Sequence, residues 1–441
     1  MTGRILAKNI GWQGLAIAIF ILGELLVTLL LSMGFGKQGF GLYAFAFAYA
    51  FIGFQAVDMR IADAVIAFYP ALERDGAPAA HALAAFAVAL DALRAFAGLA
   101  ALALSAPLLV PHLWKEAPAV AEVLLMATFL FLNNMLIGST RGYLRVTGAF
   151  RRQAMLQAAA SMAKVAAAGL AVWSGARDIR AVLEWMCAAG GLFLLANIWL
   201  LAGHARARGF TLSLARRGLP LLPRRKLLVF MWHNYIAGLS GIVTKELDIL
   251  VLSSMTGAAA VGVYRLAKSF AGGLGALWDA LFFVLFPEIS RLLAAADHDR
   301  LRRLIRLNIT GGLAASALML AGGTAAVWLF IRWFYAGLGY DQAPVLFAIL
   351  AARYLVWAPM MWLNPLVLSL GQAHLSAIAA WMAAAAAAAM LWVFTGLWAA
   401  PGAAAANALS SAALLLPLYL LASRKGLLKQ AFKDQAPRKA G

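Results

Sequence analysis

Long apolar stretches separated by short polar connections run through the whole chain. A helix that crosses a lipid bilayer needs about 20 mostly apolar residues, and twelve stretches come close to that length. We therefore predict an all-α polytopic membrane protein with about 12 transmembrane helices. The predicted spans are residues 10–33, 40–57, 82–110, 119–138, 154–173, 181–201, 228–255, 261–286, 308–331, 344–370, 375–397 and 402–421.

Composition supports this class of protein and limits the chemistry. The chain is 64% hydrophobic and 12% charged, which is far more apolar than a soluble protein of this length. The first apolar stretch lacks a small-residue cleavage site, so we expect it to stay as a membrane span. The chain has a single cysteine, Cys187, which excludes an internal disulfide and a cysteine metal cluster. We find no phosphate-binding loop, nucleophile elbow or metal motif, and we expect no cofactor, no catalytic residue and no enzymatic activity.

The net charge of +19 is distributed as in a membrane protein. If the N-terminus is cytoplasmic, the cytoplasmic segments carry 26 of the 37 lysines and arginines. Such an excess on one side is the positive-inside bias of membrane proteins. We therefore expect both termini in the cytoplasm and no nucleic-acid partner.

A basic segment divides the predicted spans into six and six. We expect an N-terminal lobe at 1–203, a cytoplasmic linker at 204–227, a C-terminal lobe at 228–423 and a cytoplasmic tail at 424–441. The motif that starts at Gly41 (GLYAFA) returns at Gly262 (GVYRLA), 221 residues later. Two lobes of six helices enter the membrane in the same orientation, so we predict a pseudo-two-fold axis along the membrane normal and a central cleft for substrate.

Ionised residues interrupt two of the apolar stretches in the second half. Charge inside a bilayer costs about 3 kcal/mol or more and marks a functional-site candidate. One interpretation is internal neutralisation, in which Lys245 and Arg265 pair with the two acids nearest Lys245 while Lys268 extends outward. The other interpretation is a cluster that receives an anionic head group. The residues concerned are Lys245, Glu246, Asp248, Arg265, Lys268 and Asp279.

Five further charged positions inside predicted spans are candidates. Asp91 and Arg94 are three residues apart on one helix and can pair with each other. Lys164 has no acid in its own span, and Arg353 shares a stripe with aromatic and amide side chains; either cation could line a water-filled cavity. Glu24 could pair with Lys164 or Arg94, or it could carry a proton.

Several short segments resemble those of a known transporter family. They are residues 248–253 (DILVLS), Gly257, 261–267 (VGVYRLA), 286–291 (FPEISR) and 141–148 (RGYLRVTG). With the helical organisation, they resemble the polysaccharide transporter family of the multidrug/oligosaccharidyl-lipid/polysaccharide exporter (MOP) superfamily. Proteins of this kind are O-antigen or exopolysaccharide flippases, which move undecaprenyl-diphosphate-linked oligosaccharides across the bacterial inner membrane by alternating access.

The resemblance implies a cationic central cavity, a lipid-linked oligosaccharide as substrate, and contacts with membrane lipids and other polysaccharide assembly proteins. We expect a monomer in the bacterial inner membrane. The cations available for an anionic head group are Arg265, Lys268, Lys245, Lys164, Arg353 and Arg94. The acids available for ion coupling are Glu24 and Asp248. The chain departs from a purely cationic cavity in placing Glu246 and Asp248 beside Lys245.

Two alternatives remain open. A cation-coupled multidrug antiporter of the same superfamily would be expected to have mainly acidic residues in its cavity, and here cations are at least as numerous. A membrane glycosyltransferase or polymerase would be expected to carry a large extracytoplasmic loop, and the predicted outer loops are short.

Overall fold

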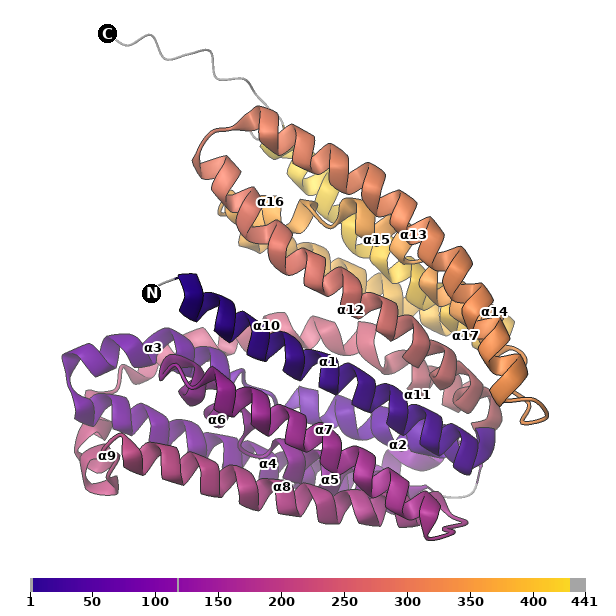
Figure 1. Cartoon of the computed structure of the whole chain (residues 1–441), viewed down its shortest axis with the longest axis horizontal. Helices are drawn as coiled ribbons and strands as arrows, with labels where there is room; N and C mark the ends of the chain where they lie inside the picture. Colours follow the sequence, from indigo (N-terminus) through magenta and orange to yellow (C-terminus); the bar gives the residue numbers. More distant parts are fainter. Residues whose placement is uncertain (1–2, 117–118, 429–441) are drawn as a thin grey trace. The chain divides into compact units, whose positions relative to one another are not determined.

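The computed structural model describes residues 3–116 and 119–428, and these are helical almost throughout (Figure 1). No strand occurs in these two ranges. Of the expected tail at 424–441, residues 429–441 lie outside the described part. The elements are α1 (Gly3–Gly34), α2 (Gly36–Ala56), α3 (Ile61–Asp75), α4 (Ala77–Leu113), α5 (Val120–Asn134), α6 (Ile137–Val146), α7 (Phe150–Trp173), α8 (Ile179–Ala207), α9 (Leu212–Gly218), η1 (Leu219–Leu221), α10 (Arg224–Lys245), α11 (Leu247–Met255), α12 (Ala258–Ala294), α13 (His298–Phe334), α14 (Ala343–Ala351), α15 (Tyr354–Met360), α16 (Leu363–Ser369) and α17 (Ala373–Arg424).

The predicted class, an all-helical multi-pass membrane protein, is confirmed. Within the described residues, ten helical segments are long and apolar enough to cross a membrane. Many of their large apolar side chains point outward; Leu104, Trp173 and Trp199 are 76%, 85% and 80% exposed. Apolar surface on this scale would be unfavourable in water, whereas lipid tails solvate it well.

The predicted number of twelve spans differs from these ten for two reasons. Residues 375–397 and 402–421 belong to one 52-residue helix, α17, which is kinked between them. The stretch at 228–255 is broken into α10 and α11. The kink in α17 is at Ala399, whose φ of 52° and ψ of −127° are not helical. Pro401 follows two residues later, lacks an N–H and clashes with the preceding turn, which is the usual cause of such a kink.

The chain divides into two compact units. Unit 1 comprises Met1–Ile242 and Gly257–Gly262, and unit 2 comprises Val243–Thr256 and Val263–Gly441. The lobe boundaries at 203 and 228 stay a prediction from the sequence. The connection at 58–81, in which we predict a short interfacial helix, contains α3.

Each unit has its own packed interior. In unit 1, α1 packs on α7, α5 on α2 and α8, and α4 on α3 and α9. In unit 2, α17 packs on α11, α14 and α16, while α13 packs on α14 and α15. The apolar core of unit 2 includes Trp278 and Ile289 of α12, Ile305 of α13 and Leu366 of α16. Within each unit, helices therefore bury apolar faces against neighbouring helices of the same unit, and other apolar faces are left for lipid.

The two copies of the repeated motif meet at their glycines within unit 1. A side chain on Gly41 of α2 would overlap the carbonyl of Ala258, and one on Gly262 of α12 would overlap the carbonyl of Lys37. Glycine at these positions lets two helix backbones approach closely, as small residues do in membrane helix packing. The repeat therefore marks a helix crossing.

This crossing predicts a specific effect of adding one methyl group. Gly41→Ala is expected to lower the free energy of unfolding by about 1–3 kcal/mol, because the methyl group has no space beside the Ala258 backbone. Gly191→Ala on α8 is the control, since a side chain there meets nothing within 4 Å. The control is expected to leave stability unchanged or raise it by up to about 1 kcal/mol. Unfolding of purified variants in detergent micelles measures both; equal stability of the two variants would contradict the close crossing.

Candidate functional site

Three of the predicted spans are broken inside the apolar stretch. The breaks separate α5 from α6 in unit 1, and α10 from α11 and α14 from α15 in unit 2. The last carbonyls and first N–H groups at a break have no partner within the helix. In a membrane, such backbone is tolerated only where protein surrounds it or water reaches it. The side chains that form hydrogen bonds with these backbone groups are therefore candidates for the functional site.

The break between α5 and α6 is bridged by an ion pair on α4. Asp91 is fully buried and accepts hydrogen bonds from Arg94 Nε at 2.7 Å and from the Ser139 backbone N–H, in the first turn of α6, at 2.5 Å. Arg94 also donates to the Asn134 carbonyl at the end of α5, at 3.4 Å. An anion thus faces a helix N-terminus and a cation faces a helix C-terminus, the favourable arrangement for both helix dipoles.

Arg94 has two further contacts in the same place. Its Nη1 lies 3.4 Å from Asp58 Oδ1, and its guanidinium lies over the Phe54 ring, 5.2 Å from the centroid. The side chain is enclosed, with 6% of the residue exposed. Pairing of Asp91 with Arg94, anticipated from their spacing, is confirmed.

A lysine on α12 bridges the break between α10 and α11 in the same manner. Lys268 Nζ donates to the carbonyl oxygen of Lys245, the last residue of α10, and to Asp248 Oδ1 at 2.8 Å in the first turn of α11. Asp248 Oδ1 also accepts from its neighbouring Ile249 N–H at 2.9 Å. In both units, then, a cation contacts the end of one half-helix and its paired aspartate contacts the start of the next.

The remaining charges around this break are arranged in pairs as well. Arg265 Nη1 donates to both carboxylate oxygens of Glu246, at 3.0 and 2.9 Å, and Lys268 lies 3.4 Å from Glu246 Oε2. The expectation that Lys268 extends outward is therefore wrong, because it lies between two acids. Lys245 has an exposed side chain at the end of α10.

Two neutral side chains, Tyr264 and Asn407, contact Asp248, and Asn407 connects it to the break between α14 and α15. Asp248 Oδ2 accepts from the Tyr264 hydroxyl at 2.5 Å and from Asn407 Nδ2 of α17 at 2.8 Å. The side-chain oxygen Oδ1 of Asn407 accepts in turn from Arg353 Nη1 at 3.2 Å. Arg353 stands between α14 and α15, directly before Tyr354, where α15 begins. Hydrogen bonds thus link Asp248 of α11, Tyr264 of α12 and Asn407 of α17 to the cation Arg353.

Within the described part of this network, Arg353 forms no ion pair, and Asp279 of α12 interacts with it electrostatically from a longer distance. Among the described residues, no carboxylate lies within 4.0 Å of its guanidinium. Its Nε is buried and has no hydrogen-bond partner there. Its guanidinium also lies over the Tyr354 ring, 5.7 Å from the centroid. A half-buried guanidinium with an unused donor is suited to receive an anion.

Lys164 and Glu24 form a separate pair in unit 1. Lys164 Nζ of α7 donates to both oxygens of Glu24 on α1, at 2.7 and 2.8 Å. It also lies 5.5 Å from the centroid of the Phe47 ring. Of the partners anticipated for Glu24, Lys164 is therefore the one it contacts.

The structure thus brings four of the eight predicted site residues into one network in unit 2: Arg265, Lys268, Asp248 and Arg353. Glu24 and Lys164 form their own pair, Arg94 serves the α5–α6 break, and Lys245 lies at the end of α10. Their roles in substrate binding or ion coupling stay predictions. We find no group of three or more acidic, histidine or cysteine residues able to hold a metal in the described ranges.

Sequence reasoning did not identify Tyr264 and Asn407 as part of this site. Tyr264 occurs in the repeated motif, and its counterpart there is Tyr43. Asn407 is a lone amide in an alanine-rich stretch, which is a signal because a polar side chain inside a membrane helix needs a partner. Both signals are in the sequence, but neither specifies the partner.

Comparison with solved structures places this helix arrangement among known folds. An inward-facing structure of a multidrug resistance MATE family transporter of the MOP superfamily has a TM-score of 0.72 at 14% identity, over 96% of this chain and 99% of that chain. The lipid II flippase MurJ, in an inward closed conformation, has a TM-score of 0.68 at 14% identity, over 95% and 89% of the two chains. A MOP superfamily transporter from Pyrococcus furiosus has a TM-score of 0.63 at 12% identity, over 96% of each chain.

The chain has the fold of the MOP superfamily transporters. No family model and no curated protein matches the sequence. At 12–14% identity, the likeness to these structures establishes the fold, and the substrate has to be argued from the side chains.

Proposed function

We propose that this protein is a flippase that moves a lipid-linked oligosaccharide with a diphosphate head group from the cytoplasmic to the outer leaflet of the bacterial inner membrane. The observation that carries the proposal is Arg353. Burying a cation without an anion is costly, and the protein places no carboxylate within 4.0 Å of this guanidinium in its described part. The phosphates of the substrate would supply negative charge in direct contact with Arg353, which the more distant Asp279 does not.

The chemistry of Arg353 fits a phosphate better than a drug cation. A guanidinium offers a planar set of donors that matches two phosphate oxygens at once. Nε, the donor without a partner, lies on the edge of the guanidinium used in one such bidentate contact. MurJ, which shares the fold, is described as a lipid II flippase, and this likeness supports the proposal.

The network behind Arg353 offers a way to couple substrate binding to a conformational change. Asn407 contacts both Arg353 and Asp248, so an anion that draws Arg353 away would also remove a partner from the Asn407 amide. Asp248 serves the α10–α11 break through Lys268. Alternating access would then follow from rearrangement of these helix ends, assisted by the inside-negative potential, about 2.3 kcal/mol per charge per 100 mV for an outgoing anion.

The test is flipping of a fluorescent undecaprenyl-diphosphate oligosaccharide in proteoliposomes. Arg353→Gln is expected to slow flipping about 10- to 100-fold, since a hydrogen bond to a charged group contributes about 1.5–3 kcal/mol. Arg353→Lys, which keeps the charge, is expected to retain more activity than Arg353→Gln. The matched control is Arg332→Gln, an arginine that lies over the Trp328 ring; it is expected to flip at the wild-type rate. Unaltered flipping by Arg353→Gln would remove the basis of the proposal.

A cation-coupled multidrug antiporter is the second candidate, and one observation favours it. Asp248 is 3% exposed and contacts a lysine, a tyrosine and an asparagine, an arrangement in which loss or gain of a proton would change several contacts at once. The same proteoliposomes distinguish the two functions. Exchange of a cationic dye for protons, without flipping of the lipid-linked oligosaccharide, would support the antiporter and exclude the flippase.

A further inference from the structure

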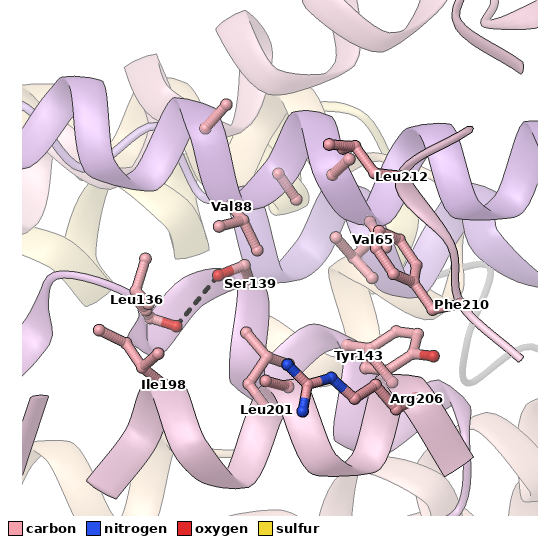
Figure 2. Close-up of a pocket in the computed structure, with 16 residues that line it drawn as sticks. Val65, Val88, Leu136, Ser139, Tyr143, Ile198, Leu201, Arg206, Phe210 and Leu212 are labelled. Atoms are coloured by element: carbon pink, nitrogen blue, oxygen red, sulfur yellow. Dashed lines mark hydrogen bonds between the residues drawn. The ribbon is translucent and has the colours of Figure 1, made fainter. Parts of the chain in front are cut away.

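A cavity of about 560 Å³ lies in unit 1 beside the α5–α6 break, and its lining includes Ser139, whose backbone N–H donates to Asp91. Figure 2 shows its lining side chains, which come from α3, α4, α6 and α8 and from the segment that leads into α9. Val88, Leu136, Ile198 and Leu201 are among them. The volume is within the roughly 300–1,000 Å³ of ligand sites in proteins.

Apolar side chains form nearly all of this wall. The single charged lining residue is Arg206, in the last turn of α8. Figure 2 shows its side chain extending alongside Leu201 and the Tyr143 ring. Ile198 is 44% exposed and Leu212 is 59% exposed, so apolar surface continues from the cavity to the outside of the unit. The cavity is therefore an apolar groove with one cation at its end.

The neighbouring basic side chains are already engaged by the protein. Arg208 donates to the Thr147 carbonyl at 3.2 Å and lies 3.6 Å from Glu73 Oε1. Arg152 Nη1 lies 2.6 Å from the His204 ring. Arg206 has an exposed side chain and makes no hydrogen bond or ion pair with any described residue. It is thus the cation at this groove that remains available to a ligand.

We propose that this groove binds an anionic glycerophospholipid, with an acyl chain in the apolar cavity and the phosphate at Arg206. Charge complementarity selects this occupant. The basic residues at 204–226 indicate that this end of α8 faces the cytoplasm, and the cytoplasmic leaflet carries anionic lipids that bind basic pockets between membrane helices. A zwitterionic lipid fills the same cavity but brings a second cation near Arg206, so it binds more weakly. The site is independent of the proposed function.

Binding of lipid to the full-length protein in detergent micelles tests the proposal. The probes are dioleoyl phosphatidylglycerol, dioleoyl phosphatidylcholine with the same chains, and glycerol phosphate, which is a head group without chains. Native mass spectrometry and a thermal-shift titration read out binding. Wild type is expected to prefer phosphatidylglycerol over phosphatidylcholine about five-fold, and Arg206→Gln is expected to abolish that preference, because one arginine near an anionic lipid contributes about that factor.

Further variants test binding of the acyl chain and binding of the phosphate one at a time. Ala85→Trp, which fills the cavity from α4, is expected to weaken binding of both lipids, and Arg206→Lys is expected to keep the preference. Arg217→Gln removes an equal charge from an exposed arginine on α9 outside the lining and serves as the control. The proposal is overturned if Arg206→Gln and Arg217→Gln bind phosphatidylglycerol equally, if Ala85→Trp has no effect, or if glycerol phosphate binds as tightly as the lipid.

Discussion

Replacing Asp91 with alanine is expected to lower the free energy of unfolding by about 3–5 kcal/mol, the usual cost of removing one member of a buried ion pair. The loss has two sources. Of its two carboxylate partners Arg94 would keep only Asp58, at 3.4 Å, and the Ser139 N–H at the start of α6 would lose its acceptor. The effect is large because Asp91 is fully buried, so water cannot replace the missing carboxylate.

Unfolding of Asp91→Ala in detergent micelles, followed by temperature or denaturant, measures this effect. Glu73→Ala is the matched control, because its ion pair with Arg208 is about half exposed and should contribute less than about 1 kcal/mol. Removing both partners, as Asp91→Leu with Arg94→Met, is expected to recover part of the loss because no charge is then left buried without its partner. A decrease below about 1 kcal/mol for Asp91→Ala would show that the pair does not stabilise the α5–α6 break.

Replacing Asp248 with alanine is expected to have an effect of similar size on stability and to stop transport. The carboxylate is 3% exposed and accepts from Lys268, Tyr264 and Asn407. Its loss leaves the Tyr264 hydroxyl and the Asn407 amide without an acceptor, and Lys268 keeps only Glu246 at 3.4 Å as a carboxylate partner. Breaking a buried pair in this way costs about 3–5 kcal/mol.

Asp248→Asn distinguishes the charge from the shape of this side chain. It keeps an acceptor for Tyr264 but removes the negative charge opposite Lys268, so we expect partial recovery of stability and no recovery of transport. Asp299→Ala on α13 is the control: its carboxylate is 86% exposed and lies 3.7 Å from Arg302, a pair worth less than about 1 kcal/mol. Wild-type flipping or dye transport by Asp248→Ala, measured in proteoliposomes, would exclude a role for Asp248 in transport.

In both units, a cation and an aspartate bind the two helix ends at a break, and this changes the interpretation of the charged residues. Arg94 and Lys268 each donate to a backbone carbonyl in the last turn of one half-helix. Asp91 accepts from a backbone N–H in the first turn of α6, and Asp248 accepts from one in the first turn of α11. These charges hold helix ends in place. Arg353 differs because, among the described residues, an amide and an aromatic ring contact it directly, whereas the acid Asp279 acts on it only from a longer distance.

The sequence by itself determined the membrane-spanning helices, the asymmetry of basic residues and the pairing of Asp91 with Arg94. All three follow from patterns local to the chain: 20-residue apolar stretches, the charge of short connections and a spacing of three residues on one helix. Periodicity assigns a residue to a face of its helix and the helical rise gives its depth, and together they predicted that Lys245, Asp248, Arg265 and Lys268 can meet.

Only the tertiary structure decided which charges meet across the fold. Glu24 and Lys164 are 140 residues apart, and Asn407 reaches Asp248 across 159 residues. The breaks at Glu246 and between α5 and α6 contain no proline, so they depend on the side chains that complete the helix ends. Helical periodicity carries no information on which face of another helix lies opposite, because that is set by packing of segments far apart in the chain.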